Sequence, residues 1–306
     1  MIKLIHKTSK ERLMGIYYVL FNPHAKNETA GREVSKIEKY LPNDELIYID
    51  ISKTTSYAEI FENMHVDDKI VIVGGDGTIN RFVNDTRDIK IDNEIFYFGI
   101  GTGTDFLTDI SKKGEVAPFS LKEYIKELPT VEIKGKTYKF LNGIGYGIDG
   151  YCCEEADKIR GTTNKPINYS AIAIKGLLFH YKPTQATVLV DGTPYMFEKV
   201  WLAPTMNGRF YGGGMMITPT QNRLSTEKKL SLAILHGSGK LKTLMIFPSI
   251  FKGKHVKYKK YFKILEGKEI TVEFDRPTAL QIDGETVLDV KRYTARAGVR
   301  HEDLVR

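Results

Sequence analysis

At 306 residues, the chain is long enough for one large domain or two medium ones, each with its own hydrophobic core. Its 42% hydrophobic and 27% charged residues are ordinary for a globular protein and exclude wholesale disorder. The net charge of +7 points toward an anionic partner, which leaves a nucleotide, a nucleic acid and a membrane surface as candidates.

Several classes of protein are excluded by composition. The two cysteines, Cys152 and Cys153, are neighbours, which excludes a disulfide framework and fits a reducing compartment. The histidines lack the spacing of a zinc site. The longest apolar stretch, around residues 169–181, is broken by Lys175 and is too short to span a bilayer, and the amino terminus lacks a signal-peptide core. We therefore expect a cytoplasmic protein, with contact at the inner face of the membrane left open.

The first 130 residues alternate between strand-like and helix-like patterns. Residues 15–21 form a continuous apolar run typical of a buried parallel strand, and residues 31–41 carry apolar side chains at helical spacing. Further strands are predicted at 46–51, 70–73 and 95–98, and further helices at 58–64 and through 79–83. This alternation predicts βαβ crossovers and a doubly wound, mostly parallel α/β sheet covered on both faces.

After about residue 131 the pattern changes to short strands. They are predicted at 138–141, 186–190, 199–202, 230–235, 261–265, 270–274, 279–282 and 286–290, with helices near 167–180 and 241–251. The pairs Asp191-Gly192, Glu266-Gly267 and Asp283-Gly284 are typical of hairpin turns. We expect an antiparallel β-sandwich. The predicted domains are 1–130 and 131–291, with a tail at about 292–306 that could return to the first.

Three predicted strands of the first half end in loops of glycine or small polar residues, at 22–26, 74–78 and 99–106. Ligands of open α/β sheets bind beyond the carboxyl ends of the strands, and glycines before a helix let backbone N–H groups face a phosphate. Such loops can be glycine-rich for steric reasons alone. Gly-Gly-Asp-Gly-Thr at 74–78 directly after an apolar strand is more specific, and together the three loops favour a phosphate site. Asp76 cannot attract phosphate, so we expect it to hold Mg²⁺ or an ordered water against the nucleotide.

Two other nucleotide-binding signatures fail. Gly135-Lys136-Thr137 resembles the end of a Walker A loop, but Thr130 stands where a glycine is required. Residues 145–150 satisfy GxGxxG after a strand, but no acidic residue follows at a strand end about twenty residues later. We interpret 145–150 as a crowded turn rather than a dinucleotide site.

The order of the motifs resembles the diacylglycerol kinase catalytic-domain superfamily over roughly residues 14–295. The motifs are Asn22-Pro23, 74–78, 101–106, 142–147 and Asp283-Gly284-Glu285. The chain looks like short bacterial lipid kinases related to diacylglycerol and sphingosine kinases, which lack regulatory domains. Gly-Gly-Asp-Gly-Thr is shared with NAD kinases and, in variant form, with phosphofructokinases, whereas the late Asp-Gly-Glu favours lipid kinases.

The resemblance implies roles for particular residues. Glu285 would be the general base that accepts the proton of the lipid hydroxyl, and Asp76 the second catalytic residue, which would also hold Mg²⁺ through ATP or water. Without the resemblance, Asp283-Gly284-Glu285 would be interpreted as a hairpin turn with solvated acids. Thr54 aligns nearly as well as one of the implied ATP-binding residues, Thr55. The implied ATP-binding residues are Asn22, Pro23, His24, Ala25, Lys26, Thr55, Gly74, Gly75, Asp76, Gly77, Thr78, Ile79, Asn80, Thr102 and Asp105.

The chain departs from the family pattern in its loops and in one strand. Thr104 stands where the family usually has Asn, and Glu132 where it has Asp. Ala25-Lys26 replaces Ser-Gly, so Lys26 would supply charge in place of backbone donors.

A further departure affects a second metal site. Many bacterial members bind a structural Mg²⁺ through an Ala-Pro-Asp stretch and a following Asp-Gly pair, which here correspond to Thr218–Thr220 and Lys228-Lys229. Because carboxylates are the main ligands of such a cation, we predict that this site is absent or remodelled, with Glu227 as the nearby acid.

Residues 251–263 interleave six lysines with aromatic residues. Such a segment suits anionic lipid head groups, single-stranded nucleic acid, or simply a solvated helix end and a protected edge strand. The membrane and solvated interpretations both stay open, and no nucleic acid is expected. The apolar residues of the helix at 167–180, including Ile174, are expected to face the core rather than an acyl chain.

The leading hypothesis is an ATP- and Mg²⁺-dependent lipid kinase whose acceptor is a lipid alcohol, first diacylglycerol and then sphingoid bases or polyprenols. One alternative is an NAD kinase-like enzyme, which would phosphorylate a polar ribose and would not need Asp283-Gly284-Glu285. Another is a nucleotide- or lipid-binding protein that has lost catalysis, which Thr104 and Thr220 motivate. The expected partners are ATP, the lipid and, transiently, an anionic membrane surface; a homodimer is left open.

Overall fold

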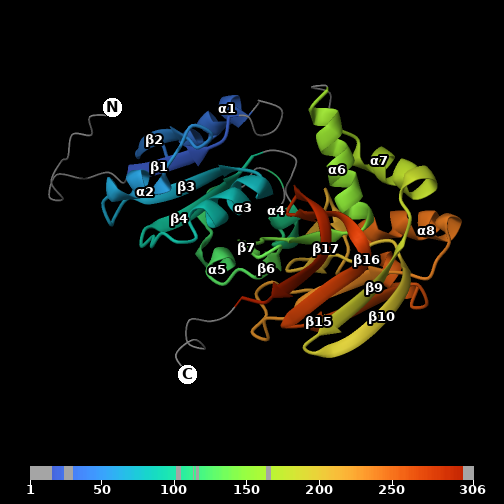
Figure 1. Cartoon of the computed structure of the whole chain (residues 1–306). Coiled ribbons are helices and arrows are strands. Elements are labelled where there is room, and N and C mark those ends of the chain that lie inside the picture. The colour runs from blue at the N-terminus through green and yellow to red at the C-terminus, as the bar shows by residue number, and fades with distance from the viewer. Residues whose placement is uncertain are drawn as a thin grey trace.

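The chain forms two halves that lie side by side (Figure 1), seen here in a computed structural model. The first half, in blue and teal, is an α/β sandwich, and the second, in green to red, is built mainly of strands. The residues that the structure describes are 16–23, 30–100, 105–112, 114, 117–162 and 167–298.

The first half contains a five-stranded sheet in the order β2-β1-β3-β4-β5. The first four strands are parallel, and β5 runs antiparallel to β4. Apolar side chains fill β1 and β3 almost without interruption, as expected for strands covered on both faces. The predicted mostly parallel α/β sheet is therefore confirmed. The strands are β1 (Ile16–Phe21), β2 (Glu45–Asp50), β3 (Lys69–Gly74), β4 (Glu94–Gly99) and β5 (Phe119–Ser120).

Helices cover both faces of this sheet. On one face, Phe82 of α3 and Tyr57 of α2 pack on Ile72 of β3, and on the other, Ile37 packs in a cluster with Val71. The helix predicted at 31–41 is shorter than expected, because α1 gives way to the 3₁₀ helix η1. The elements are α1 (Ala30–Glu33), η1 (Val34–Lys39), α2 (Tyr57–Glu62), α3 (Asp76–Asp85), α4 (Asp105–Asp109) and α5 (Lys122–Ile125).

The second half contains a ten-stranded antiparallel sheet and a separate two-stranded ribbon, β12–β13. This confirms the predicted antiparallel, β-rich half. The strands are β6 (Thr130–Ile133), β7 (Lys136–Lys139), β8 (Gly143–Tyr146), β9 (Thr184–Val190), β10 (Thr193–Val200), β11 (Thr205–Met206), β12 (Phe210–Tyr211), β13 (Met215–Met216), β14 (Leu230–Leu235), β15 (Phe262–Gly267), β16 (Glu269–Ile282) and β17 (Glu285–Arg296).

The strand β16 joins two parts of this sheet. The strands predicted separately at 270–274 and 279–282 are one long strand, which pairs with β9 through its first part and with β8 through its last. Its register shifts between Glu273 and Thr278, where Pro277 cannot donate to the ladder. The predicted turn pair Glu266-Gly267 instead belongs to the end of β15.

Helices of the second half lie at the boundary and at its outer end (Figure 1). Residues 145–150 are crowded as predicted, since a Cβ on Gly150 would lie 1.9 Å from the carbonyl oxygen of Ala279. However, this segment is not only a turn, because Gly147 adopts φ +98° and α6 begins directly after it. The helices are α6 (Ile148–Arg160), α7 (Tyr169–Lys175), the π-helix η2 (Gly176–His180), α8 (Lys240–Ile246), and the 3₁₀ helices η3 (Phe247–Lys252) and η4 (Lys254–Lys257).

Across the described ranges, every helix is too short or too polar to cross a bilayer.

Candidate active site

A cleft of about 860 Å³ lies between the two halves. On the side of the first half it is lined by residues that follow the carboxyl ends of the parallel strands: Asn22 after β1, Ile51 after β2, Gly75–Thr78 after β3 and Ile100 after β4. This is the edge at which open α/β sheets bind ligands.

The second half supplies a different lining. Around α6, α7 and η3 the cleft is bounded mainly by apolar side chains. The cleft therefore has a polar end on the parallel sheet and an apolar end on the helices of the β-rich half. The apolar lining consists of Ile148, Cys152, Ile167, Tyr169, Ala173, Met215, Phe247 and Phe251.

The N-terminus of α3 projects into the polar end. A Cβ on Gly74 would lie 2.2 Å from Thr78 Oγ1, so this glycine is explained by close packing of the helix on its strand. Gly77 has no such explanation, because nothing in the described part of the chain lies within 4 Å of the Cβ that it lacks. Its bare backbone is left open to a ligand in the cleft.

Asp76 occupies the first turn of α3 and is buried. Its Oδ2 accepts hydrogen bonds from the Phe106 backbone at 3.0 Å and from Asn142 Nδ2 at 2.8 Å. Its Oδ1 is also buried and has no partner among the described residues. Burial raises the pKa of Asp76 to about 7; the charges of Asp105 and Asp283 add to the shift, and the two N–H donors oppose it. One carboxylate oxygen thus remains available to a ligand.

Asp105, at the start of α4, has no such free oxygen. Its two carboxylate oxygens accept from the backbone N–H groups of Gly213 at 2.8 Å and Gly214 at 2.7 Å. These glycines and Gly212 all have positive φ, which a larger residue would adopt only with strain. Burial, chiefly, raises the pKa of Asp105. Asp105 therefore fastens a loop of the second half onto the first.

Asp283 fixes the hairpin turn between β16 and β17. Its Oδ1 accepts from the backbone N–H groups of Asn142 at 2.8 Å and Gly143 at 2.9 Å. Its Oδ2 accepts from the Leu141 N–H at 2.5 Å and from Asn80 Nδ2 at 2.7 Å. Because of these contacts, the next residue but one, Glu285, is held at the cleft as an exposed carboxylate.

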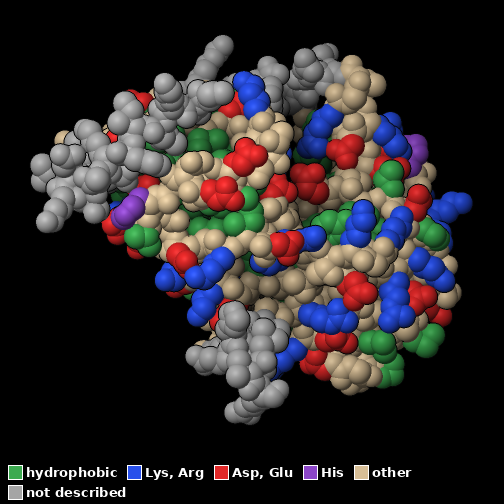
Figure 2. All heavy atoms as spheres, turned by 60° about the vertical axis from the view of Figure 1, so that its left-hand side comes forward, with side chains coloured by type: hydrophobic (Ala, Val, Ile, Leu, Met, Phe, Trp, Pro, Cys, Tyr) green, Lys and Arg blue, Asp and Glu red, His purple; other side chains and the backbone are tan. Residues whose placement is uncertain are grey.

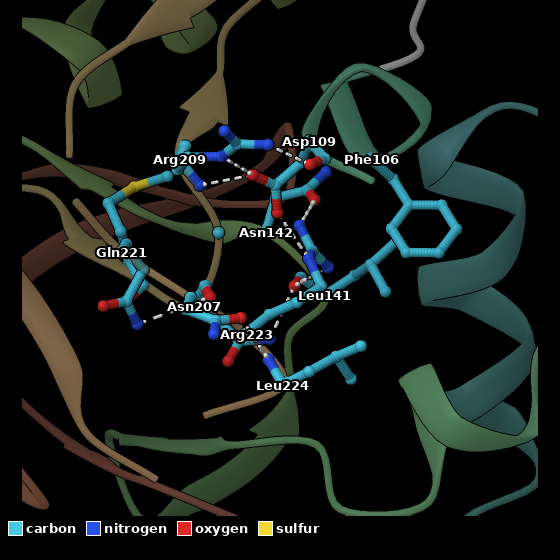
Figure 3. Close-up of polar contacts among 12 residues, drawn as sticks. Phe106, Asp109, Leu141, Asn142, Asn207, Arg209, Gln221, Arg223 and Leu224 are labelled. Carbon is cyan, nitrogen blue, oxygen red and sulfur yellow. Dashed lines mark hydrogen bonds and ion pairs between the residues drawn. The ribbon is translucent and has the colours of Figure 1, made fainter. Parts of the chain in front are cut away.

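A buried polar network around Asp109 (Figure 3) reaches Asp76 through the side chain of Asn142. Asp109 accepts from Arg209 Nε at 2.8 Å and from Arg223 Nε at 2.5 Å. Arg223 Nη2 also donates to Asn142 Oδ1 at 2.9 Å, and Asn142 in turn donates to Asp76. The side chains of Arg223 and Asp109 are each only 4% exposed, so the charge of each is balanced inside the protein.

Asp149 is a further buried acid on the cleft, in the first turn of α6. Burial raises its pKa to about 7, and the nearby hydroxyl of Tyr211 opposes the shift. Asp149 Oδ2 and the Tyr211 hydroxyl each lack a well-formed hydrogen bond within the described segments. Two polar groups are thus left to meet a ligand beside the apolar lining.

Two family models together match most of the chain. Residues 17–131 match the diacylglycerol kinase catalytic domain, and residues 142–295 match the YegS C-terminal NAD kinase beta sandwich-like domain. The chain belongs to the diacylglycerol kinase catalytic-domain superfamily. It is therefore a kinase of the lipid kinase type, as the order of its motifs predicted.

Individual members of the superfamily resemble the chain over most of its length. It is 23% identical over 299 residues to the Bacillus subtilis protein named "Putative lipid kinase YtlR", covering 89% of this chain and 94% of that one. It is 25% identical over 197 residues to a Mycobacterium tuberculosis diacylglycerol kinase, covering 62% of each. A crystal structure of "a putative diacylglycerol kinase" from Bacillus anthracis shares the fold, with a TM-score of 0.65, 17% identity and 96% of each chain covered.

Seven of the residues to which the superfamily resemblance assigned a catalytic or ATP-binding role line the cleft. Asp76 and Glu285, which come from the two halves, are among them. The seven are Asn22, Gly75, Asp76, Gly77, Thr78, Asp105 and Glu285. Four others, His24, Ala25, Lys26 and Thr102, lie outside the described residues, as does Thr104.

The remaining candidates lie elsewhere. Ile79 is fully buried in the core, and Pro23 packs against Gly31. Asn80 donates to Asp283 and to the carbonyl of Lys139. Thr55 is exposed in the loop between β2 and α2. Thr54, which aligns nearly as well, donates to the Asp50 carbonyl at 3.3 Å.

Residues 218–229, where a second metal site is expected to be absent or remodelled, contain a buried arginine, Arg223. Thr220 is exposed, and Glu227 pairs with Lys229 at 2.6 Å, while Arg223 turns inward to Asp109. Within the described residues, no three histidine, cysteine or acidic side chains gather closely enough to bind a metal by themselves. The other departure, Glu132, pairs with Arg296 at 3.0 Å on the surface of the β-rich half.

Sequence reasoning missed four polar residues of this region: Asn142, Asp149, Arg223 and Asp109. Asn142 begins the 142–147 motif, so that motif could have indicated it. Asp149 lies within the GxGxxG-like segment, so the acid in that segment is the signal that could have indicated it. No local pattern marks Arg223 or Asp109.

Proposed function

We propose that this kinase transfers the γ-phosphoryl group of ATP to the hydroxyl of a lipid alcohol, with diacylglycerol as the first candidate. The observation that carries the proposal is the composition of the cleft: Asp76 and the open α3 N-terminus lie at its polar end, Glu285 at the tip of the hairpin, and an apolar surface beyond them. The cleft would accommodate both a polar phosphate donor and an apolar acceptor.

The nucleotide would bind with its phosphates at the N-terminus of α3. The helix dipole and the bare backbone at Gly77 favour an anion there. The buried, unpartnered Asp76 Oδ1 suits Mg²⁺ bound together with the phosphates. When bound, that cation would neutralise phosphate charge, and the protein would contribute Asp76 to hold it.

Glu285 would act as the general base. Phosphoryl transfer needs alignment, charge neutralisation and one proton acceptor. Glu285 is exposed to the cleft, while Asp283 and its four donors keep its hairpin in place. The acceptor hydroxyl would lie against Glu285, with its acyl chains along α6, α7 and η3.

The polar part of the acceptor would meet Asp149 and Tyr211. Both lie in the cleft beside the apolar lining, with hydrogen-bonding capacity left over. A second hydroxyl or an ester carbonyl of the lipid would satisfy them.

One face of the β-rich half fits contact with an anionic lipid surface. We call it the α8–η2 face: Phe179, Leu241 and Met245 are 72%, 77% and 67% exposed. Lys240 Nζ donates to the Leu178 carbonyl at 2.7 Å, which joins the two helices into one surface. α8 itself carries Lys240 and Lys242, and each lysine would contribute about 1 kcal/mol near anionic lipids. Peripheral contact with a membrane is therefore part of the proposal.

The segment 251–263 would contribute mainly charge to this contact, since its exposed phenylalanine, Phe251, lines the cleft. Phe262 is buried, and lysines lie over the rings of Tyr258 and Tyr261. Because those ring faces are covered, the segment does not favour stacking with nucleic-acid bases. Ile174, expected in the core, is instead 46% exposed on the adjacent α7.

The test is transfer of labelled phosphate from ATP to diacylglycerol in mixed micelles by the purified full chain, with NAD and other lipid alcohols as competing acceptors. Labelled phosphatidic acid is expected. Label on NAD would instead support the NAD kinase alternative, and ATP binding without transfer to any acceptor would support an inactive binding protein.

A further inference from the structure

The guanidinium group of Arg223 is separated from Asp76 only by the side chain of Asn142. It belongs to a loop that has no part in the proposed chemistry. Arg223 sits between β13 and β14 and is 4% exposed. Figure 3 shows it enclosed by Asp109, Asn142 and the ring of Phe106.

Arg223 supports both groups that donate to Asp76. Its Nη2 donates to Asn142 Oδ1 at 2.9 Å, and its guanidinium carbon lies 4.9 Å from the ring centroid of Phe106. Asn142 Nδ2 and the Phe106 N–H are the two donors to Asp76 Oδ2. A third contact, from Nη1 to the Leu141 carbonyl at 3.1 Å, fixes the direction of the guanidinium plane.

This arrangement determines which way the Asn142 amide points. An amide rotated by half a turn would set its NH₂ group against the donors of Arg223 and its oxygen against the Asp76 carboxylate. Both contacts would be repulsive. With Arg223 in place, Asn142 can present only its NH₂ group to Asp76, which leaves Asp76 Oδ1 as the oxygen without a partner.

We propose that Arg223 is a positioning residue, which orients Asn142 and Phe106 on Asp76 and so fixes the carboxylate that faces the nucleotide. The role in turnover rests on the proposed kinase activity, whereas the role in orienting Asn142 does not. The residue acts through neighbours and touches no reacting atom.

Arg209 offers a matched control. It also pairs with Asp109, through Nε at 2.8 Å and its backbone N–H at 3.0 Å, but it is 32% exposed. Among the contacts of the described residues, it has no hydrogen bond to Asn142. Replacing Arg209 therefore disturbs the Asp109 ion pairs and leaves the Asp76 donors in place.

The kinetic experiment compares Arg223→Met, Arg223→Lys and Arg209→Met in the full chain. Arg223→Met is expected to lower kcat by about 30-fold or more, because small displacements at a reacting group cost up to about 100-fold, while KM for ATP changes by less than about threefold. Arg223→Lys restores part of kcat, and Arg209→Met leaves kcat within about threefold. If both Met variants lower kcat equally, and the decrease follows their loss of thermal stability, Arg223 is only structural and the proposal is wrong.

A second measurement needs no activity. Urea unfolding of Arg223→Met, Asp76→Asn and the double variant is expected to be non-additive by about fivefold or more in the unfolding equilibrium constant, since the two sites share Asn142. The same cycle with Arg209→Met is expected to be additive. Additivity for both arginines overturns the proposal. The coupling could be found for Arg223 while the wild-type chain phosphorylates no lipid. That result would uphold the orienting role and refute the kinase assignment.

Discussion

The second half contains two hairpins with the same turn and different surroundings. Asp191-Gly192 joins β9 to β10 and Asp283-Gly284 joins β16 to β17, and all four residues have positive φ, as the two-residue hairpin turn requires. Asp191 accepts two backbone N–H groups at an exposed corner. Asp283 accepts four donors from two separate segments, one N–H group from Asn80 on α3 and three from the backbone of residues 141–143. The Asp-Gly sequence specifies the backbone conformation of both turns. The hydrogen-bond donors around the aspartate decide whether the turn becomes part of a site.

The largest expected effect is at the residue that follows the second turn. Replacing Glu285 with Gln should lower kcat by about 10³-fold, since a general base contributes about 10²–10⁴-fold. Its exposed position predicts unchanged thermal stability. Thr193 follows the first turn, so Thr193→Val is the matched control and should leave kcat unchanged. Retained activity in Glu285→Gln, measured with labelled ATP and diacylglycerol, would show that another group accepts the proton.

Removing the two turn carboxylates tests the comparison directly. Asp283→Ala leaves several backbone donors without partners and should cost about 3 kcal/mol of stability, with a loss of about 100-fold in kcat as Glu285 moves. Asp191→Ala should cost less than about 1 kcal/mol, with kcat unchanged. Urea unfolding and lipid phosphorylation measure both. Equal costs at the two turns would mean that the four contacts of Asp283 add nothing to the turn itself.

Asp149 sharpens the comparison because it is buried without the donors that surround Asp283. Its folded-state pKa of about 7 lies above the unfolded value, so the folded protein keeps this proton where the unfolded chain has lost it. The contribution of Asp149 to stability is therefore complete at low pH and declines as the pH rises toward and through 7. Relative to wild type, Asp149→Asn should gain about 2 kcal/mol of stability between pH 5 and pH 7. Urea unfolding of both proteins at a series of pH values measures this. Parallel curves of unfolding free energy against pH would contradict the assignment.

The smallest expected effect contrasts the α8–η2 face with the first hairpin. Leu241→Asp combined with Met245→Asp should weaken binding to phosphatidylglycerol vesicles by about tenfold, because apolar contacts are lost and acidic charge is added. Met196 on β10 is 84% exposed, so Met196→Asp is the control and should bind normally. Sedimentation with anionic and with zwitterionic vesicles measures the difference. Equal loss in the double variant and in Met196→Asp would place the contact elsewhere.

The sequence was most informative where structure is local. Continuous apolar strands followed by glycine loops predicted the parallel sheet, and the shared edge of that sheet brings Asn22, Gly75 and Ile100 together. The Asp-Gly pairs predicted both hairpins. Only the family resemblance indicates Glu285, since the other Asp-Gly pair, Asp191-Gly192, forms an exposed hairpin turn away from the cleft.

What could not be predicted depends on contacts between distant segments. Nothing near Asn80 indicates that its amide meets Asp283, and nothing near Arg223 indicates that its loop folds inward to Asn142. The segment around Asp149 fits the GxGxxG pattern in form, and that pattern says nothing about a buried acid beside an apolar cleft. Such pairings follow from how the two halves pack, which periodicity along the chain does not encode.

The pairing of the last strand has a consequence for synthesis of the protein. β17, which begins with Glu285, closes against β6, the strand translated just after the first half. A ribosome therefore releases the glycine loop at 74–78 long before it releases Glu285. Under the proposed mechanism, a nascent chain with a folded first half would bind its nucleotide before β17 had brought the proton acceptor, Glu285, into the sheet.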